Sequence, residues 1–318
     1  MDTRDLLVRF GIQLGRRFTR KEKQVFLGFI QQHFRELGYT SKALMGKTKR
    51  RESINLYVGN IAKAKTIVIA HYDTPVRIFF RKTKFYPFDS GQAYFASLVQ
   101  TFFPTLIFSI IGVFIFRAGM TAWTDNLFSL VSIATIVGLI FLGVLSFVIA
   151  RGIGNINNLN MNSAAIVACI KMAEKMPSKN RDEIAFVLTD NECVGRHGDN
   201  LVLEALPSTI GQRQIIHLRC IGDGEVIVVG CKESNKDLSK KFKKHYKGEK
   251  QLKQIALDEN EAKLTALNTY PKSISIAAAY PVGNQYVVFN TQTAKDIEVD
   301  LDNIETISDA CVALAQEK

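Results

Sequence analysis

Two uncharged apolar runs stand out in the pattern of hydrophobic and polar residues along this chain. They extend from Ala96 to Phe116 and from Leu127 to Ala150, and the ten residues between them are expected to turn the chain back. Roughly 20 helical residues span the ~30 Å hydrocarbon core of a bilayer. Pro104 lies near the start of the first run, where a helix tolerates proline, and Trp123 between the runs is typical of a membrane interface. The pattern predicts a transmembrane helical hairpin over residues 96–150.

Basic residues near the ends of the two runs predict the orientation of the hairpin. The flanking segments contain Arg77, Arg81, Lys82, Lys84 and Arg151, whereas the connecting segment contains only Arg117. Because Lys and Arg concentrate on the cytoplasmic side of membrane proteins, the flanks are predicted to be cytoplasmic. Residues 1–95 and 151–318 then lie on the same side and can form one discontinuous domain. We therefore expect a cell-membrane protein with two spans, whose N- and C-termini are both cytoplasmic.

Outside the hairpin, the pattern alternates between helical and strand periods. Apolar residues recur with the period of a helix in residues 21–39, 162–175 and 301–315. Short runs rich in β-branched residues predict strands. These runs lie at residues 54–60, 66–73, 183–189, 214–220, 225–229 and 287–290. The alternation of strands with helices indicates an α/β fold.

Composition excludes several classes of protein. The chain has 318 residues, of which 47% are hydrophobic, so it is too apolar for a disordered polybasic protein despite a net charge of +11. The five cysteines are scattered, which argues against both a disulfide framework and a CxxC zinc motif. Arginines interrupt the apolar residues at the N-terminus, so no secretory signal is predicted.

One segment, Lys232–Lys253, is strongly basic, with nine lysines against three acidic residues. A solvated helix or loop explains it, and attraction to anionic lipid headgroups is the more specific alternative. Nucleic acid is not an expected partner, because no nucleic-acid recognition motif accompanies these lysines.

Candidate chemistry follows two of the predicted strands. His71 and Asp73 come at the end of the strand TIVIA, two residues apart and therefore on the same side. A second acidic group, Asp190 and Glu192 with Cys193, follows the strand IAFVLT. Because the carboxyl ends of parallel strands share one edge of a sheet, the two groups are expected to define a crevice.

In order and spacing these segments resemble the zinc aminopeptidases and carboxypeptidases of metallopeptidase family twenty-eight, the bacterial leucyl aminopeptidase type. The helix ending in ELGY, the strand TIVIAHYDT, the helix NSAAIVACIKMAEKM and the strand FVLTDNE are similar to parts of that family. The resemblance covers nearly all residues outside the hairpin. It implies a zinc-exopeptidase-like mixed sheet with a parallel centre and helices on both faces, here interrupted by the hairpin. It also implies two zinc ions and a glutamate that activates metal-bound water.

The resemblance assigns roles to four residues. His71 matches the first metal ligand, Asp73 the carboxylate that orients this ligand, and Glu192 the general base. Cys193 stands where a second glutamate binds metal, and a thiolate is also a zinc ligand.

The remaining metal positions lack their anionic ligands. The bridging aspartate should come just before the helix, where this chain has Asn160 and Asn162, and Arg219 falls at the position of a ligating aspartate. Asn290 replaces the last ligating histidine. Neutral amides and a guanidinium remove the negative charge that holds two zinc ions, so we expect no binuclear zinc site. Arg219 is instead expected to act as a fixed cation paired with Asp73 or Glu192.

A single zinc ion is the alternative, held by His71, Cys193 and either His197 or His217, with Glu192 as the base. The four-residue spacing from Cys193 to His197 suits one face of a helix. Such a site would make the protein an active, divergent aminopeptidase.

The function expected first is that of a membrane-anchored, catalytically impaired pseudo-peptidase with no cofactor. Both connections of the hairpin leave from the crevice end of the predicted sheet. The expected partners are therefore the lipid bilayer and a membrane-associated peptide or membrane protein. A transporter is not favoured, because the two predicted spans carry no charged residue.

Overall fold

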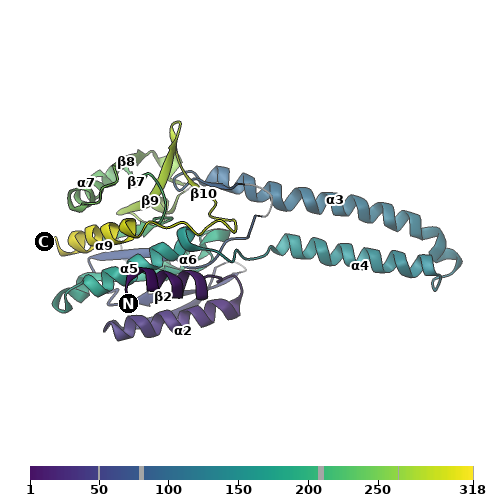
Figure 1. Cartoon of the computed structure of the whole chain (residues 1–318), viewed down its shortest axis with the longest axis horizontal. Helices are drawn as coiled ribbons and strands as arrows, with labels where there is room; N and C mark the ends of the chain where they lie inside the picture. Colours follow the sequence, from purple (N-terminus) through teal and green to yellow (C-terminus); the bar gives the residue numbers. More distant parts are fainter. Residues whose placement is uncertain (49–50, 79–81, 207–210, 264, 318) are drawn as a thin grey trace. The chain divides into compact units, whose positions relative to one another are not determined.

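The computed structural model describes residues 1–48, 51–78, 82–206, 211–263 and 265–317. The chain forms two compact units, shown in sequence colours in Figure 1. The first unit comprises Met1–Ser90 and Gly154–Lys318, and the second comprises Gly91–Ile153.

The first unit is built on one mixed β-sheet. Its strands are β1 (Ser41–Thr48), β2 (Arg51–Val58), β3 (Thr66–His71), β4 (Lys84–Phe85), β5 (Ile184–Thr189), β6 (Gln214–Leu218), β7 (Val226–Lys232), β8 (Leu252–Leu257), β9 (Ser273–Val282) and β10 (Gln285–Phe289). Among the described residues the strand order is β1-β2-β5-β3-β6-β9-β10-β4, with β7 pairing both β9 and β8.

The centre of the sheet is parallel, as the sequence predicted. β3 pairs in parallel with β5 on one side and with β6 on the other, and β6 pairs in parallel with β9. All six residues of β3 and of β5 are buried, which is why these strands are apolar without alternation. The parallel register brings the carboxyl ends of β3, β5 and β6 to the same edge of the sheet.

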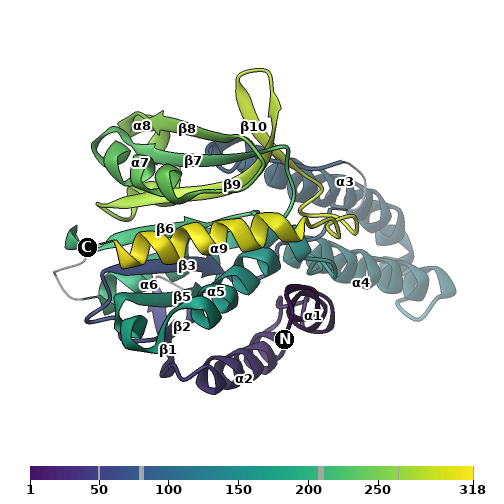
Figure 2. The same ribbon diagram turned by 60° about the vertical axis from the view of Figure 1, so that its left-hand side comes forward.

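Helices cover both faces of the sheet, and the fold class predicted from the sequence is confirmed. The helices of this unit are α1 (Thr3–Leu7), α2 (Arg20–Glu36), α5 (Ala164–Lys175), α6 (His197–Ala205), α7 (Lys236–His245), α8 (Glu259–Lys263) and α9 (Leu301–Gln316). Figure 2 shows α5 and α9 side by side across one face. Val68 and Ala70 of β3 share a hydrophobic core with these helices, whereas Ile67 and Ile69 pack in a second core with Val202 of α6.

The second unit is an antiparallel pair of helices, α3 (Ser90–Asp125) and α4 (Leu130–Arg151) (Figure 1). The stretches Phe102–Thr124 and Leu130–Arg151 are long and apolar enough to cross a membrane. The two helices approach closely at Gly119, where a Cβ atom would collide with the side chain of Thr135.

The turn of this pair lies later than predicted. Most of the segment expected to turn is helical, because α3 continues to Asp125. The Trp123 ring contacts the Phe116 ring at a centroid distance of 5.2 Å, and its Nε1 donates to the Ser132 carbonyl of α4 at 3.4 Å. Since α3 begins at Ser90, Pro104 lies in its interior rather than near its start.

Several elements carry no clear signal in the sequence. β1 (SKALMGKT) has one β-branched residue and exists as a strand because it pairs along its whole length with β2. The middle of β9 is a run of small residues, Ala277–Ala279, that pairs with β7. Tertiary pairing overrides weak local propensity in both strands.

Candidate functional site

Three neighbouring strands place the candidate residues at one edge of the sheet. His71 is the last residue of β3 and pairs with Thr189, the last residue of β5. Glu192 and Cys193 therefore follow β5 beside His71, and Arg219 follows β6 on the other side of β3. Four of the residues proposed from the sequence are thus brought together by the parallel register.

His71, Asp73 and Cys193 form a compact group whose ligand-type atoms all lie within 4.8 Å of one another. Nδ1 of His71 is 3.5 Å from Oδ1 of Asp73 and 3.9 Å from Sγ of Cys193. The other ring nitrogen, Nε2, is buried and has no hydrogen-bond partner in the described part of the chain. Asp73 thus lies beside Nδ1 of His71, which leaves Nε2 as the ring nitrogen without a neighbouring carboxylate among the described residues.

The Asp73 carboxylate also organises the loop after β5. It accepts the backbone N–H groups of Glu192 and Cys193, both at 3.1 Å. Burial opposes its ionisation, but hydrogen bonding to His71 and the positive charge of Lys23 outweigh burial and hold the pKa of Asp73 at about 2. This carboxylate remains an anion although its side chain is buried.

Glu192, the expected general base, is in a different electrostatic setting. Its Oε1 accepts the backbone N–H of Asp199 at 2.7 Å. Burial, together with the negative charges of Asp199 and Asp73, raises the pKa of Glu192 well above its usual value. The carboxyl group therefore holds its proton into a pH range where a free glutamate would be a base.

Burial also keeps the neighbouring thiol and imidazole groups neutral. It raises the pKa of the Cys193 thiol well above its usual value, and the negative charge of Asp73 adds to this effect. It lowers the pKa of His71 and, more strongly, that of His217, and the positive charge of Arg219 lowers both further.

Arg219 does not make the ion pair expected from the sequence. Its half-buried guanidinium lies over the ring of Phe85, with Cζ 5.1 Å from the ring centroid. Within the described part of the chain no ion pair joins it to Asp73 or Glu192. Its charge nevertheless acts on His71 and Cys193 through space.

The buried cation that does contact this region is Arg17, which sequence analysis missed. Its side chain is fully buried and donates to the backbone carbonyls of Phe10 and Tyr72, and to the side chains of Asn162 and Ser163. Burial lowers the pKa of Arg17 to about 9, against the opposing charge of Asp73. No local pattern distinguishes Arg17 from its exposed neighbours in GRRFTRK.

Asn160 and Asn162 precede α5, where the bridging aspartate was expected, and both have structural partners. Nδ2 of Asn162 donates to the Asp73 carbonyl at 2.7 Å. Oδ1 of Asn160 accepts the backbone N–H groups of Gly222 and Asp223 at 2.8 and 3.1 Å. The one oxygen of the Asn160 amide is therefore already bonded on two sides.

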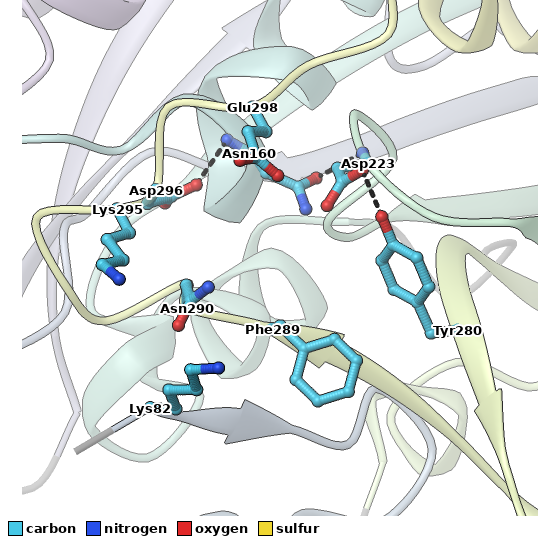
Figure 3. A pocket seen from close by; sticks show the side chains of 9 residues that line it. All are labelled: Lys82, Asn160, Asp223, Tyr280, Phe289, Asn290, Lys295, Asp296 and Glu298. Carbon is cyan, nitrogen blue, oxygen red and sulfur yellow. Dashed lines mark hydrogen bonds between the residues drawn. The ribbon is translucent and has the colours of Figure 1, made fainter.

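Asn160 and Asn290 line a pocket of about 300 Å³ (Figure 3). Asn290 follows β10 with a positive φ of 63°, and its backbone N–H donates to the Thr83 carbonyl at 2.9 Å. The positions that the resemblance assigns to the bridging aspartate and the last histidine therefore open onto the same cavity.

A second buried carboxyl group, Asp296, lies in the wall of this pocket. It accepts the backbone N–H groups of Asn160 and Met161 at 2.8 and 3.2 Å. Burial outweighs these hydrogen bonds and, with the negative charge of Asp223, raises the pKa of Asp296 to about 8. Sequence analysis missed Asp296, which lies in the irregular segment TQTAKDIEVD.

The additional histidines do not join the His71 group. A break at Gly195 separates Cys193 from His197, the first residue of α6, so the two do not share one helical face as expected. His217 lies 3.9 Å from the Asp199 carboxylate. Among the described residues, the only three-donor metal-binding group is that of His71, Asp73 and Cys193.

The residues present do not fit a pair of zinc ions. The buried, unpartnered Nε2 of His71 is a ligand-type atom. The carboxylate that should bridge the ions is the amide of Asn160, whose oxygen accepts two backbone hydrogen bonds. The positive charge of the nearby Arg219 further opposes the binding of two dications.

Comparisons with known proteins find similarity in structure alone. No model of a known protein family matches the chain. No curated protein matches its sequence.

Solved structures of zinc-exopeptidase-like proteins share the fold. The glutaminyl cyclase of Porphyromonas gingivalis superposes with a TM-score of 0.56 at 10% identity, covering 98% of this chain and 97% of that one. A Zn-dependent exopeptidase from Parabacteroides distasonis gives a TM-score of 0.54 at 8% identity, with coverage of 99% and 96%. A leucine aminopeptidase precursor from Bacteroides thetaiotaomicron gives a TM-score of 0.51 at 13% identity, covering 100% of this chain and 98% of that one. The chain therefore has the fold of aminopeptidase-like and glutaminyl-cyclase-like proteins.

Proposed function

We propose that this protein is a membrane-anchored, peptidase-like binding protein that does not carry out binuclear zinc catalysis. The observation that carries the proposal is the state of Asn160, whose oxygen accepts two backbone hydrogen bonds where the fold's metal site needs a bridging carboxylate.

The membrane part of the proposal rests on α3 and α4, whose apolar stretches are long enough to span a bilayer. Within the first unit, the chain leaves toward α3 just after β4, which pairs with β10 beside Asn290. The chain returns at Gly154, which pairs with Val76, three residues after Asp73. Both junctions therefore lie close to the candidate site, so a membrane-associated peptide or protein is the proposed ligand.

Metal analysis tests the proposal. The purified full-length chain, dialysed against buffered zinc, is expected to retain zinc well below one ion per chain by plasma mass spectrometry. The triple variant Asn160→Asp, Arg219→Asp and Asn290→His restores two carboxylates and an imidazole, and we expect it to retain more zinc. Hydrolysis of aminoacyl amides by the wild-type protein is expected to be absent.

The alternative is a divergent aminopeptidase with one zinc ion, and the His71, Asp73 and Cys193 group favours it. It predicts one zinc ion per wild-type chain, lost in both His71→Asn and Cys193→Ser. That result, accompanied by hydrolysis that depends on Glu192, would replace the first proposal.

The orientation is also a proposal, with both termini in the cytoplasm, based on the basic flanks of the hairpin. Single cysteines introduced near Met1 and at the exposed Asn126 are expected to differ in their labelling by a membrane-impermeant maleimide applied to intact cells. Only the cysteine at Asn126, in the turn between α3 and α4, should react. Labelling near Met1 would reverse the orientation.

A further inference from the structure

The pocket beside Asn160 contains charges of both signs that are not paired with one another. Four of its charged residues are Lys82, Lys295, Asp223 and Glu298. Within the described ranges, none of these four forms an ion pair at 4.0 Å or less. Opposite charges that converge on one cavity without pairing leave both donors and acceptors available to a ligand.

The charges are also separated within the pocket. In Figure 3, Lys82 and Lys295 lie on one side, and Asp223 and Tyr280 lie on the other. The Tyr280 hydroxyl donates to Oδ1 of Asp223 at 2.8 Å, which fixes the carboxylate against an aromatic ring. A carboxylate beside an aromatic ring suits an ammonium group, because both attract a cation.

Asn160 supplies a fixed donor between the two sides. Its side chain is buried, with 2% exposure, and its Oδ1 is held by the backbone N–H groups of Gly222 and Asp223. Nδ2 therefore has a determined direction, and Figure 3 shows it pointing into the pocket. This nitrogen has no hydrogen-bond partner among the residues that the structure describes. A buried donor without a partner is costly, so an acceptor from a ligand is expected to meet it.

We propose that this pocket binds a small zwitterion, with an anionic group held by Lys82, Lys295 and Nδ2 of Asn160, and an ammonium group held by Asp223. The volume of about 300 Å³ admits a ligand of the size of a dipeptide or a phospholipid headgroup. Tyr280 and Phe289, whose rings lie 5.4 Å apart, form the apolar part of the wall. The proposal rests on the proposed function in one respect, that Asn160 faces a ligand rather than a metal ion.

Two kinds of small molecule carry this combination of an anionic group and an ammonium group. Glycylglycine carries its negative charge as a carboxylate, and phosphoethanolamine carries it as a phosphate. Isothermal titration of the full-length chain in detergent, with a chelator present, is expected to show binding of at least one of them. Acetate, phosphate and ethanolamine, which carry one charge sign each, are expected to bind about tenfold more weakly or worse. Binding of glycylglycine alone identifies an amino-acid or peptide ligand, and binding of phosphoethanolamine alone identifies a headgroup.

Variants locate the binding site. Asn160→Asp keeps the oxygen that accepts two N–H groups but replaces the donor with a negative oxygen, so we expect about tenfold weaker binding or more. Lys295→Gln and Asp223→Asn should each weaken binding of the zwitterion, whereas only the lysine change should weaken binding of phosphate. Lys179→Gln and Asp258→Asn, both exposed outside the pocket, are the matched controls and should bind like the wild type.

Equal binding of the zwitterions and of their single-charge counterparts would overturn the proposal, as would absence of binding by both zwitterions. This comparison uses the wild-type chain, so it stands even where a variant fails to fold. Metal analysis of the zinc-dialysed chain, prepared without the chelator, separates the two proposals. Stoichiometric zinc without zwitterion binding rejects both, whereas absence of both zinc and zwitterion binding rejects the zwitterion pocket alone.

Discussion

Two polar regions at the carboxyl edge of the sheet differ in how they use their charges. Around His71, the carboxylate of Asp73 is buried and accepts backbone N–H groups. Around Asn160, charged side chains line a cavity, and four of them, Lys82, Lys295, Asp223 and Glu298, make no ion pair within the described chain. We call the first the closed region, because its carboxylate is buried and hydrogen-bonded within the fold. We call the second the open region, because its charged side chains line a cavity.

The pKa values of Asp73 in the first region and Asp296 in the second are shifted in opposite directions. Hydrogen bonding to His71 and the charge of Lys23 overcome burial and hold the pKa of Asp73 at about 2. Among the described residues Asp296 forms no ion pair, and burial raises its pKa to about 8. A buried carboxyl group thus remains an anion only where the fold supplies a counter-charge. The following predictions test this difference, beginning with the largest effect.

Replacement of Arg17 by methionine is expected to have the largest effect on stability. The change leaves the buried carbonyl oxygens of Phe10, Leu14 and Tyr72 without their donor. Breaking a buried, hydrogen-bonded charge costs about 3 to 5 kcal/mol, so the free energy of unfolding should fall by this amount. Denaturant unfolding of the detergent-solubilised chain measures it.

The neighbouring Arg16 provides the matched control. Its half-exposed side chain pairs with Glu22 at 2.5 Å, and such surface pairs contribute less than about 1 kcal/mol. Arg16→Met should therefore change stability little. Equal losses in the two variants would show that Arg17 does not support the closed region.

Much of the fold was predictable, because its signals are local. Buried strands such as β3 and β5 are continuous apolar runs, and α2 has both a helical period and a capping box at Thr19. The strands β1 and β9 depend on pairing with distant segments, and no local pattern reports such pairing. The turn before α4 was predicted too early. A long apolar helix has no regular alternation of polar and apolar residues, so the sequence does not mark where it ends.

The candidate site was predictable only in part. His71, Asp73, Glu192 and Cys193 follow recognisable strands, and the parallel register brings them together. Arg17 and Asp296 were missed because their burial depends on segments more than 100 residues away in the sequence. Charged residues are usually exposed, so sequence alone favours the wrong environment for both.

Replacement of Asp73 by asparagine is the second test of the closed region. The amide offers one oxygen where the carboxylate offers two, so one of the backbone N–H groups of Glu192 and Cys193 loses its acceptor. The folded pKa of about 2 lies below the usual 3.8, so Asp73 stabilises the fold above pH 3.8. This contribution, about 2 kcal/mol, is lost as the pH falls toward 2.

Unfolding experiments at pH 6 and at low pH test this expectation. Asp73→Asn should be less stable at pH 6 and less sensitive to acid than the wild type. Asp237→Asn is the control, because its exposed side chain lies in α7. If Asp73→Asn lost as much stability at low pH as the wild type does, Asp73 would not be the anion that stabilises the closed region.

The Asp296 carboxyl group in the open region is expected to give a pH dependence of the opposite sign. It keeps its proton up to about pH 8 in the folded chain, but only up to about 3.8 when unfolded. Between these values the folded state binds one more proton, so stability falls as the pH rises, by at most about 1.4 kcal/mol per pH unit. The fall should end above about pH 8. The negative charge of Asp223 strengthens this effect, and the positive charge of Arg17 weakens it.

Asp296→Asn should remove this slope, because the amide is neutral at every pH and its oxygen still accepts a backbone N–H group from Asn160 or Met161. Unfolding between pH 6 and 8 measures the slope in wild type, in Asp296→Asn and in Glu298→Gln. Glu298 lines the same pocket but is exposed, so its replacement should leave the slope unchanged. If wild type and Asp296→Asn shared one slope, Asp296 would be ionised like Asp73, and the two regions would no longer differ in the way that their charges are held.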